Sequence, residues 1–392
     1  MKKFLFVFIT TFFVLSFFVI EDKHEYALKT EEESVEKRAI FFSYLEMNKY
    51  VKNKSTIESK KNIKEILNNI KSNGFNTLIL HVRPFSDAIY NSSIFPVSDT
   101  VKTYGKSPSY DVLKYFVDEA KKLEIEVHAW INPYRISNEE DITLIKEDNP
   151  AYEMIKSNDV KVVKNEGIFY NPASKRVNKL IISGIEELLT NYEIDGIHFD
   201  DYFYPSTDID LDNYKQYIQE GGTSSLEDYR YNNILTLLKE VYSVVKSINE
   251  NAVFGISPEG NIDNNYNKHF LDVKTILRDK GYIDYIMPQI YFGFDNEVRP
   301  FIDTLNEWKN LIKNNDIKIL PALAFYKVGE YDKYAKSGIG EWIEKNDIIS
   351  REVEESRKIN NYAGFALFRY DYVFSKKEHN KIELNNLKKV LK

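Results

Sequence analysis

The chain of 392 residues contains no cysteine, which excludes disulfide bonds, thiolate metal ligands and a lipid attached to an N-terminal cysteine. It also lacks an excess of basic residues, since its net charge is −7 and its sequence pI is about 5.6. Nucleic-acid-binding proteins usually carry a basic surface, so no nucleic-acid partner is expected. Gly-rich dinucleotide loops, phosphate-binding loops and nucleophile elbows are absent as well, and no cofactor is expected.

One long apolar run is present, and it lies at the N-terminus. Met1-Lys2-Lys3 is basic and the run from Phe4 to Ile20 carries no charge, which is the form of an export signal. The run is close to the minimum length for spanning a bilayer, and no small-residue cleavage motif precedes Glu21, so an uncleaved anchor is favoured over a cleaved signal peptide. Because the basic residues precede the run, the remaining chain is expected outside the cytoplasm, membrane-anchored or secreted.

Three segments follow from these features. Residues 1–20 are the signal or anchor, residues 21–37 are a highly charged tether, and residues 38–392 are a single globular domain without internal repeats. We expect a monomer that contacts the membrane through its N-terminal segment.

From Arg38 onward, short apolar runs alternate with stretches of helical periodicity. One such stretch places Ile63, Ile66, Leu67 and Ile70 on a single face, as in a helix with one buried side. This alternation predicts an α/β fold, specifically a (β/α)₈ or TIM barrel, rather than an open doubly wound sheet. The predicted strands are residues 39–46, 77–84, 126–133, 196–203, 252–259, 285–292, 318–326 and 364–372, with long connections after residues 133 and 204 and a last helix at 383–392.

A barrel strand points alternate side chains into the barrel. In the fourth strand this alternation turns His198 and Asp200 inward and Asp201 outward, with Asp200 at the C-terminal end, where substrate loops gather in this fold. The same alternation brings a ring of polar side chains to that end, and such a ring is costly to bury without a function. The ring consists of Glu46, Arg83, Asn132, Asp200, Gln289 and Tyr291, joined by Tyr326 and by Arg369 or Asp371.

Carboxyl groups in such a ring favour cleavage of glycosidic bonds, in which one carboxyl protonates the leaving oxygen and a second acts as nucleophile or base. Asp200 is the principal candidate, and Asp201 is kept as a substitute because strand ends twist. His81, His128 and His198 lie one or two layers below the rim. No metal site is expected from them, because a hydrolase metal site needs its histidines at the rim with a carboxylate. They are interpreted as hydrogen-bonding partners of Asp200.

Five motifs resemble those of one known family. In chain order they are Gly74–Thr77, His81–Ala88, His128–Arg135, Asp195–Pro205 and Pro288–Tyr291. They resemble motifs of the bacterial glycosyl hydrolase-like 10 family, and the resemblance covers roughly residues 38–372. It implies a TIM barrel and a cell-wall enzyme that cuts the glycan strands of peptidoglycan, as a hydrolase or a lytic transglycosylase.

The resemblance also implies roles for individual residues. Asp200 matches the fourth-strand acid of related α-glycosidase barrels. Polar residues of the family motifs match side chains expected to line the cleft, and the full substrate-binding set combines these with the ring described above. It consists of Glu46, Arg83, Trp130, Asn132, Arg135, His198, Gln289, Tyr291, Tyr326 and Arg369.

One position departs from the family pattern. After Gly255-Ile256-Ser257-Pro258, relatives carry a small or apolar residue, whereas this chain has Glu259. If Glu259 points inward with Ser257, it is a candidate second catalytic carboxylate, and otherwise it is a solvated loop residue. Without it, Glu46, Asp295 or Asp371 must serve, or there is no second carboxylate. A lytic transglycosylase allows the last case, because the muramyl 6-hydroxyl attacks in place of water.

Two other interpretations stay open at this stage. One is a glycosidase that acts on another extracellular polysaccharide. The other is a barrel that binds glycans without cleaving them.

Overall fold

The structure is a computed structural model that describes residues 35–201 and 203–392. The expected signal or anchor, and the expected tether as far as residue 34, lie outside the described residues. Residues 36–392 form one compact unit whose first strand begins at Lys37, so Glu36 and Lys37 belong to the folded part and not to the tether. Within the described ranges, no helix combines the length and apolar character needed to cross a bilayer.

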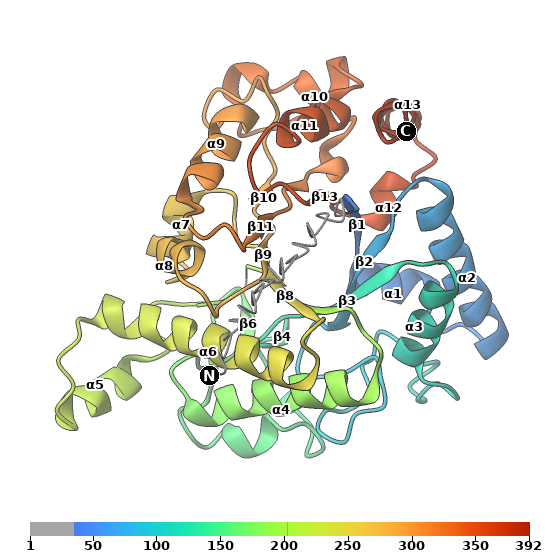
Figure 1. The fold of residues 1–392 in the computed structure, drawn as a ribbon. Helices are drawn as coiled ribbons and strands as arrows, with labels where there is room; N and C mark the ends of the chain where they lie inside the picture. The colour runs from blue at the N-terminus through green and yellow to red at the C-terminus, as the bar shows by residue number, and fades with distance from the viewer. Residues whose placement is uncertain (1–34, 202) are drawn as a thin grey trace, which may run out of the picture. The chain divides into compact units, whose positions relative to one another are not determined.

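A parallel sheet of ten strands forms the centre of the fold, in the order β10-β12-β13-β1-β2-β3-β7-β8-β9-β11. The sheet is curled and helices lie around it, as expected for a TIM-like fold (Figure 1). The strands are β1 (Lys37–Phe42), β2 (Thr77–Arg83), β3 (Glu126–Ile131), β7 (Gly196–Phe199), β8 (Val253–Ile256), β9 (Tyr285–Ile286), β10 (Gln289–Ile290), β11 (Lys318–Ile319), β12 (Ala322–Leu323) and β13 (Gly364–Leu367).

Two of the predicted strands are interrupted by proline. Pro288 separates β9 from β10, and Pro321 separates β11 from β12, because proline has no N–H group to offer a neighbouring strand. The four short strands nevertheless pair with each other, β9 with β11 and β10 with β12. The first strand of the chain, β1, lies between β2 and the last strand, β13.

A local signal in the sequence marks the start of α2. In α2 the side chain of Ser55 accepts a hydrogen bond from the Glu58 N–H at the N-terminus, and the stripe of apolar residues predicted from the sequence is buried. The helices are α1 (Tyr44–Tyr50), α2 (Thr56–Ser72), α3 (Val112–Lys122), α4 (Lys175–Asn191), α5 (Leu211–Gln219), α6 (Leu226–Ile248), α7 (Ile262–Asn267), α8 (Val273–Arg278), α9 (Phe301–Leu311), α10 (Glu341–Glu344), α11 (Ile348–Ser356), α12 (Tyr370–Val373) and α13 (Glu378–Val390).

The core has two layers. The larger layer packs the outer side of the sheet against the helices and contains residues such as Ile40 and Phe42 of β1. The smaller layer fills the inside of the curled sheet and contains Ala39, Phe41 and Trp130. The alternation that turned Glu46 inward also turned Phe42 inward, and in the first strand it is therefore wrong by one residue.

The first predicted strand is also too long. β1 ends at Phe42, because Ser43 and Glu46 form a reciprocal capping box that starts α1. The Ser43 N–H donates to Glu46 Oε2 at 2.9 Å, so Glu46 lies in a helix and not on a strand.

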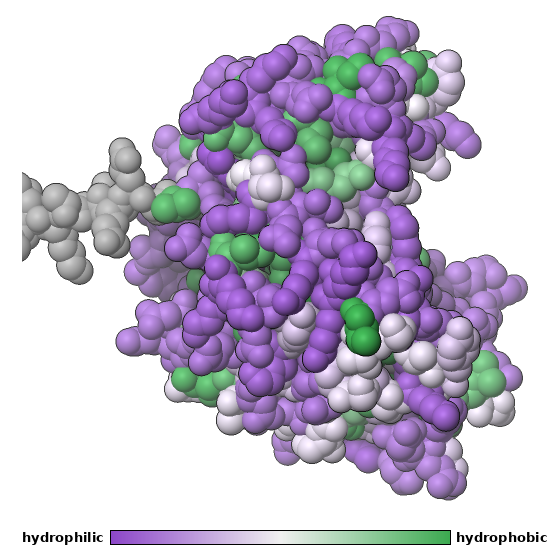
Figure 2. Space-filling view, turned by 90° about the vertical axis from the view of Figure 1, so that its right-hand side faces the viewer, coloured by the Kyte–Doolittle hydropathy of each residue, from purple (hydrophilic) through white to green (hydrophobic). Residues whose placement is uncertain are grey.

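Two long connections leave the C-terminal ends of strands, as predicted. The connection after β3 carries a small antiparallel sheet of β4 (Arg135–Ser137), β6 (Gly167–Tyr170) and β5 (Val160–Val163). The connection after β7 carries α5. The face of the molecule seen in Figure 2 is mostly hydrophilic, with small and separate apolar patches.

Candidate active site

A pocket of about 300 Å³ opens where the C-terminal ends of the parallel strands meet. This is the end at which TIM-barrel enzymes place their active sites. A larger hollow of about 920 Å³ lies at the opposite end, beside Glu126 and Asp195, and contains none of the predicted site residues. The pocket is lined by Phe41, Ser43, Tyr44, Leu45, His81, Trp130, Asn132, Arg135, Asp200, Asp201, Ser257, Gln289, Tyr291, Tyr326 and Phe368.

Asp200 lies in the pocket at the end of β7 and is only 3% exposed. Trp130 Nε1 of β3 donates a hydrogen bond to Asp200 Oδ2 at 3.1 Å and another to Asn132 Oδ1 at 3.1 Å. The His81 ring stacks on Trp130 with 3.6 Å between ring centroids and lies 3.1 Å from Asn132 Oδ1 through its Nε2. Burial lowers the pKa of His81 well below its usual value, so this ring is neutral. A rigid, uncharged support therefore holds one oxygen of Asp200.

Asp201 lines the same pocket, contrary to the expectation that it points away. Burial raises the pKa of Asp201, and the nearby Glu259 charge adds to this effect. The charge of His269 and a side-chain hydrogen bond with Gln289 act in the opposite direction. The pocket thus contains two neighbouring carboxyl groups, one of which favours its protonated form.

Glu259 lies beside the pocket but does not line it. Its Oε1 is 3.1 Å from His269 Nε2, and Asn264 Nδ2 of α7 donates to its Oε2 at 2.5 Å. These hydrogen bonds, first the one from His269, lower the pKa of Glu259. Its carboxylate is ionised and bound to groups of its own loop.

The other candidates for a second carboxylate also lie outside the pocket lining. Glu46 is buried and forms an ion pair with Arg369. These two residues, both predicted to bind substrate, therefore bind each other. Asp371 accepts hydrogen bonds from Lys49 Nζ at 2.9 Å and from the Tyr50 hydroxyl at 2.8 Å. Asp295 is paired with Lys345.

Arg83 was expected at the rim, but its side chain lies in the helix layer. Its guanidinium is 3.8 Å from the centroid of the Phe95 ring. A Cβ atom on Gly184 of α4 would lie 2.6 Å from Arg83 Nη1, so the absence of a side chain there makes room for the guanidinium. The cause is a shift in the pairing of β2 with β3 between His81 and Arg83, which breaks the alternation of side chains at the strand end.

His198 lies beneath the pocket and takes part in a hydrogen-bonded chain. Its Nε2 is 2.9 Å from Ser257 Oγ, and its Nδ1 is 2.9 Å from the Tyr285 hydroxyl, which is also 2.9 Å from His128 Nδ1. Gly255 leaves space for the Tyr285 ring, because a Cβ there would lie 2.2 Å from it. His198 was predicted to form a hydrogen bond with Asp200. Its two ring nitrogens instead contact Tyr285 and Ser257, so His198 positions Ser257. The described residues contain no group of three or more His, Asp or Glu that could hold a metal ion.

Aromatic rings form much of the remaining wall. The Tyr291 ring lies 5.6 Å from Tyr326 and 5.9 Å from Phe368, and the Tyr44 ring lies 5.3 Å from Phe85. Arg135 is the only Lys or Arg among the described residues of the lining. Tyr44 and Leu45, which α1 brings to the pocket, were not in the predicted substrate-binding set, although strand alternation turned Tyr44 inward and the Ser43-x-x-Glu46 capping box was visible in the sequence.

Comparison with known proteins identifies the family. The model of the family described as "Glycosyl hydrolase-like 10" matches residues 36–338. The chain belongs to the glycosyl hydrolase-like 10 family. Asp200, Asp201 and all other lining residues of the pocket except Phe368 lie within the matched part.

Two members named as glycosyl hydrolases are similar in sequence. "Glycosyl hydrolase YngK" of Bacillus subtilis (strain 168) is 31% identical over 296 residues, which cover 70% of this chain and 57% of that protein. "Glycosyl hydrolase DigH" of Escherichia coli (strain K12) is 30% identical over 334 residues, covering 78% of this chain and 74% of that protein. The matched part of this glycosyl hydrolase-like chain therefore spans little more than half of YngK.

Solved structures of glycoside hydrolases share the fold at low sequence identity. The PgaB (BpsB) glycoside hydrolase domain from Bordetella bronchiseptica superimposes with a TM-score of 0.61 at 12% identity, covering 89% of this chain and 98% of that one. Alpha-L-fucosidase isoenzyme 2 from Paenibacillus thiaminolyticus superimposes with a TM-score of 0.56 at 12% identity, covering 90% and 49%.

Proposed function

We propose that this protein cleaves glycosidic bonds in the glycan strands of peptidoglycan, as a hydrolase or a lytic transglycosylase. The observation that carries the proposal is the pair of carboxyl groups, Asp200 and Asp201, at the end of β7 in a pocket walled by aromatic rings. Membership of a glycosyl hydrolase-like family supports the same reaction type.

We take the fold of this enzyme to be a (β/α)₈ barrel. In this interpretation β9 and β10 are one strand interrupted at Pro288, and β11 and β12 are another interrupted at Pro321. The pairing of β9 with β11 and of β10 with β12 supports it, because each half of one interrupted strand then pairs with the matching half of the other.

The two carboxyl groups suit different roles in this reaction. Asp201 has the raised pKa that a general acid needs in order to protonate the leaving oxygen. Asp200 accepts a hydrogen bond from the Trp130 N–H, which holds one of its oxygens in place inside the pocket.

The pocket lining also suits a glycan that carries acidic groups. Tyr44, Tyr291 and Tyr326 offer apolar ring surfaces for sugar rings, and Arg135 offers a cation. Muramyl residues without peptides expose a free carboxylate, which a guanidinium recognises well. We further propose that residues 1–20 hold the enzyme on the extracytoplasmic face of the membrane, within reach of the cell wall. N-terminal sequencing of the mature protein tests whether these residues are retained.

The test is digestion of peptide-free glycan strands by the full-length protein, with the products analysed by mass spectrometry. The wild type is expected to release short saccharides, and Asp200→Asn is expected to lower the rate by roughly 10³-fold, the scale of acid–base catalysis. Asp212→Asn, on the exposed surface of α5, is the matched control and keeps the wild-type rate. The reducing end of the products separates hydrolysis, which leaves a free sugar, from transglycosylation, which leaves a 1,6-anhydro sugar.

Three results would contradict the proposal. Unchanged activity of Asp200→Asn would move the chemistry to other residues. Products from a neutral polysaccharide but none from these strands would point to a different substrate. Binding to the strands with no product, in the wild type and the variant alike, would identify a glycan-binding protein without catalysis.

A further inference from the structure

The carboxyl groups of the pocket come from one side only. Asp200 and Asp201 are the only Asp or Glu side chains among its described lining residues, and they are neighbours on the same strand end. Their Cα atoms are therefore about 3.8 Å apart. Asp200 contacts Trp130 of β3, and Asp201 contacts Gln289 of β10, so they spread sideways along one wall.

Cleavage by two enzyme carboxylates needs a different arrangement. A nucleophile and an acid that flank the bond lie about 5–5.5 Å apart on opposite sides of the sugar, and a base that activates water lies about 6.5–9.5 Å from the acid. Each carboxylate that could face this pair is engaged elsewhere. Glu259 is bound by His269 and Asn264, and Glu46 is bound by Ser43 and Arg369.

We infer that the substrate supplies the nucleophile: the carbonyl oxygen of a 2-acetamido group, on the sugar bound beside Asp200, attacks the anomeric carbon. This inference rests on the proposed function and defines its substrate class as glycans whose cleaved sugar carries a 2-acetamido group. Both sugars of peptidoglycan strands meet this requirement.

The reaction balances without any group from the opposite wall. The acetamido oxygen forms a bond to C1, while the bond from C1 to the leaving oxygen breaks and its electron pair stays on that oxygen. Asp201 gives its proton to the leaving oxygen, and the Asp200 carboxylate accepts a hydrogen bond from the acetamido N–H as that nitrogen gains positive charge. Water or a sugar hydroxyl then attacks C1, returns a proton to Asp201 and reopens the ring.

Other features of the pocket agree with these roles. Asp201 has a raised pKa, as a proton donor requires, and Trp130 fixes the Asp200 oxygen at 3.1 Å. Burial above all, and then the neighbouring Tyr326, Asp201 and Asp200, raise the pKa of Tyr291 well above its usual value. Its phenol therefore stays protonated beside the two carboxyl groups.

The first experiment changes the proposed nucleophile. Peptide-free strands are N-deacetylated and re-acylated with acetyl, difluoroacetyl or trifluoroacetyl groups, and kcat and KM are measured with the full-length protein. We expect kcat to fall at least ~100-fold from the acetyl to the trifluoroacetyl strands, because fluorine withdraws electrons from the attacking oxygen. Cleavage at one common rate overturns the inference and leaves the proposed function intact, whereas failure to cleave even the acetyl strands overturns both.

The second experiment separates the two aspartates. Asp201→Asn is expected to lower kcat/KM for strand cleavage by roughly 10³-fold, but kcat/KM for a 4-nitrophenyl N,N′-diacetylchitobioside by less than ~10-fold, because kcat/KM reports the first step and nitrophenolate leaves without a proton. Asp200→Asn is expected to slow both substrates, and Asp212→Asn neither. Equal losses on both substrates for Asp201→Asn would overturn the assignment of the acid.

The third experiment does not depend on turnover. The bicyclic thiazoline of N-acetylglucosamine is a stable mimic of the ring formed in the first step. Calorimetry with wild-type protein is expected to give a Kd at least ~100-fold lower for the thiazoline than for N-acetylglucosamine, as for other analogues of reaction intermediates. Equal affinities, or a glycosyl ester on an Asp or Glu detected by mass spectrometry during turnover, would overturn the inference.

Discussion

Among individual residues, Glu259 influences the proposed acid Asp201 through its charge. Its ionised carboxylate raises the pKa of Asp201, beyond the larger effect of burial. An acid with a raised pKa keeps its proton to higher pH, so activity is lost as the pH rises through that pKa. The position of this alkaline limb therefore reports on Glu259 even though Glu259 does not line the pocket.

Glu259→Gln is expected to move the alkaline limb of kcat/KM to lower pH, because a neighbouring negative charge that raises the pKa of Asp201 is removed. The glutamine oxygen can still accept from His269, which preserves the loop. The pH profile of kcat/KM on peptide-free strands measures the shift. A limb that stays in place, or a loss of all activity at every pH, would show that Glu259 has another role.

The sequence predicted some residues of the site and missed others for identifiable reasons. Strand alternation correctly turned Asp200 and Trp130 inward, because β3 and β7 pair in regular register. It failed for Arg83, where a bulge in β2 reverses the direction of the side chain. It failed for Asp201 because β7 ends at Phe199, and alternation does not hold beyond the end of a strand.

Among elements, the packing of α13 on α11 depends on a protonated carboxyl group. Glu383 of α13 is 1% exposed and accepts a hydrogen bond from the Ile349 N–H of α11 at 2.7 Å. Burial raises the pKa of Glu383 to about 7, from an ordinary value of 4.5. The folded protein therefore keeps a proton that the unfolded chain releases between these two pH values, and stability falls as the pH rises through this window.

Glu383→Gln is expected to flatten that fall and to raise the free energy of unfolding by about 1–3 kcal/mol above pH 7, because the amide keeps an acceptor and carries no charge. Urea unfolding at several pH values measures the effect. Glu355 of α11 forms a solvent-accessible ion pair with Lys358, so Glu355→Gln is the control. It is expected to leave the pH dependence of the free energy of unfolding unchanged. A parallel pH dependence of Glu383→Gln and the wild type would exclude this role.

The elements themselves were largely predictable, because buried helices and strands carry strong periodicity. The stripe of α2 is buried, and each predicted strand range contains strand residues in the structure. The strand ends were not predictable from periodicity, because capping at Ser43 and the prolines at 288 and 321 override it. Tyr44, predicted on a strand, lines the pocket from the start of α1.

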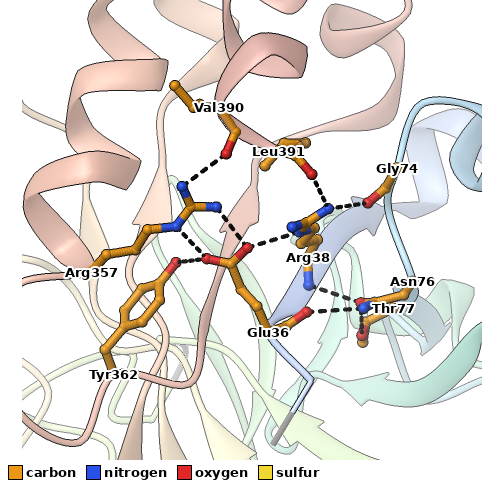
Figure 3. Close-up of polar contacts among 9 residues, drawn as sticks. All are labelled: Glu36, Arg38, Gly74, Asn76, Thr77, Arg357, Tyr362, Val390 and Leu391. Carbon is orange, nitrogen blue, oxygen red and sulfur yellow. Dashed lines mark hydrogen bonds and ion pairs between the residues drawn. The ribbon is translucent and has the colours of Figure 1, made fainter. Parts of the chain in front are cut away.

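At the level of the whole molecule, a cluster around Glu36 joins the two ends of the folded unit (Figure 3). Glu36 accepts hydrogen bonds from Arg38, Arg357 and Tyr362 at 2.7–2.8 Å. Arg357 Nη1 and Arg38 Nη1 donate to the last carbonyl groups of the chain, those of Val390 and Leu391. Burial alone raises the pKa of Glu36, but these hydrogen bonds outweigh it and lower the pKa to about 2.

Glu36→Gln is expected to lower the free energy of unfolding at pH 7 by about 1–2 kcal/mol, a value reduced for the partial exposure of the cluster. The stabilisation by Glu36 is present above pH 4.5 and is lost as the pH falls towards 2, so the difference between the variant and the wild type disappears in acid. Thermal unfolding from pH 7 down to pH 3 measures it. The exposed pair of Glu193 with Lys121 provides the control variant Glu193→Gln, and equal losses in both would contradict the proposed importance of the cluster.

The position of β1 between β2 and β13 has a consequence for biosynthesis. The first strand of the sheet gains its second neighbour only when the strand at Gly364–Leu367 has been made, and the Glu36 cluster forms only when the final helix follows. A chain emerging from the ribosome therefore carries an unpaired strand edge until β13 has been made, and long-range pairing of this kind is slow to form. Until then the sheet stays open beside β1.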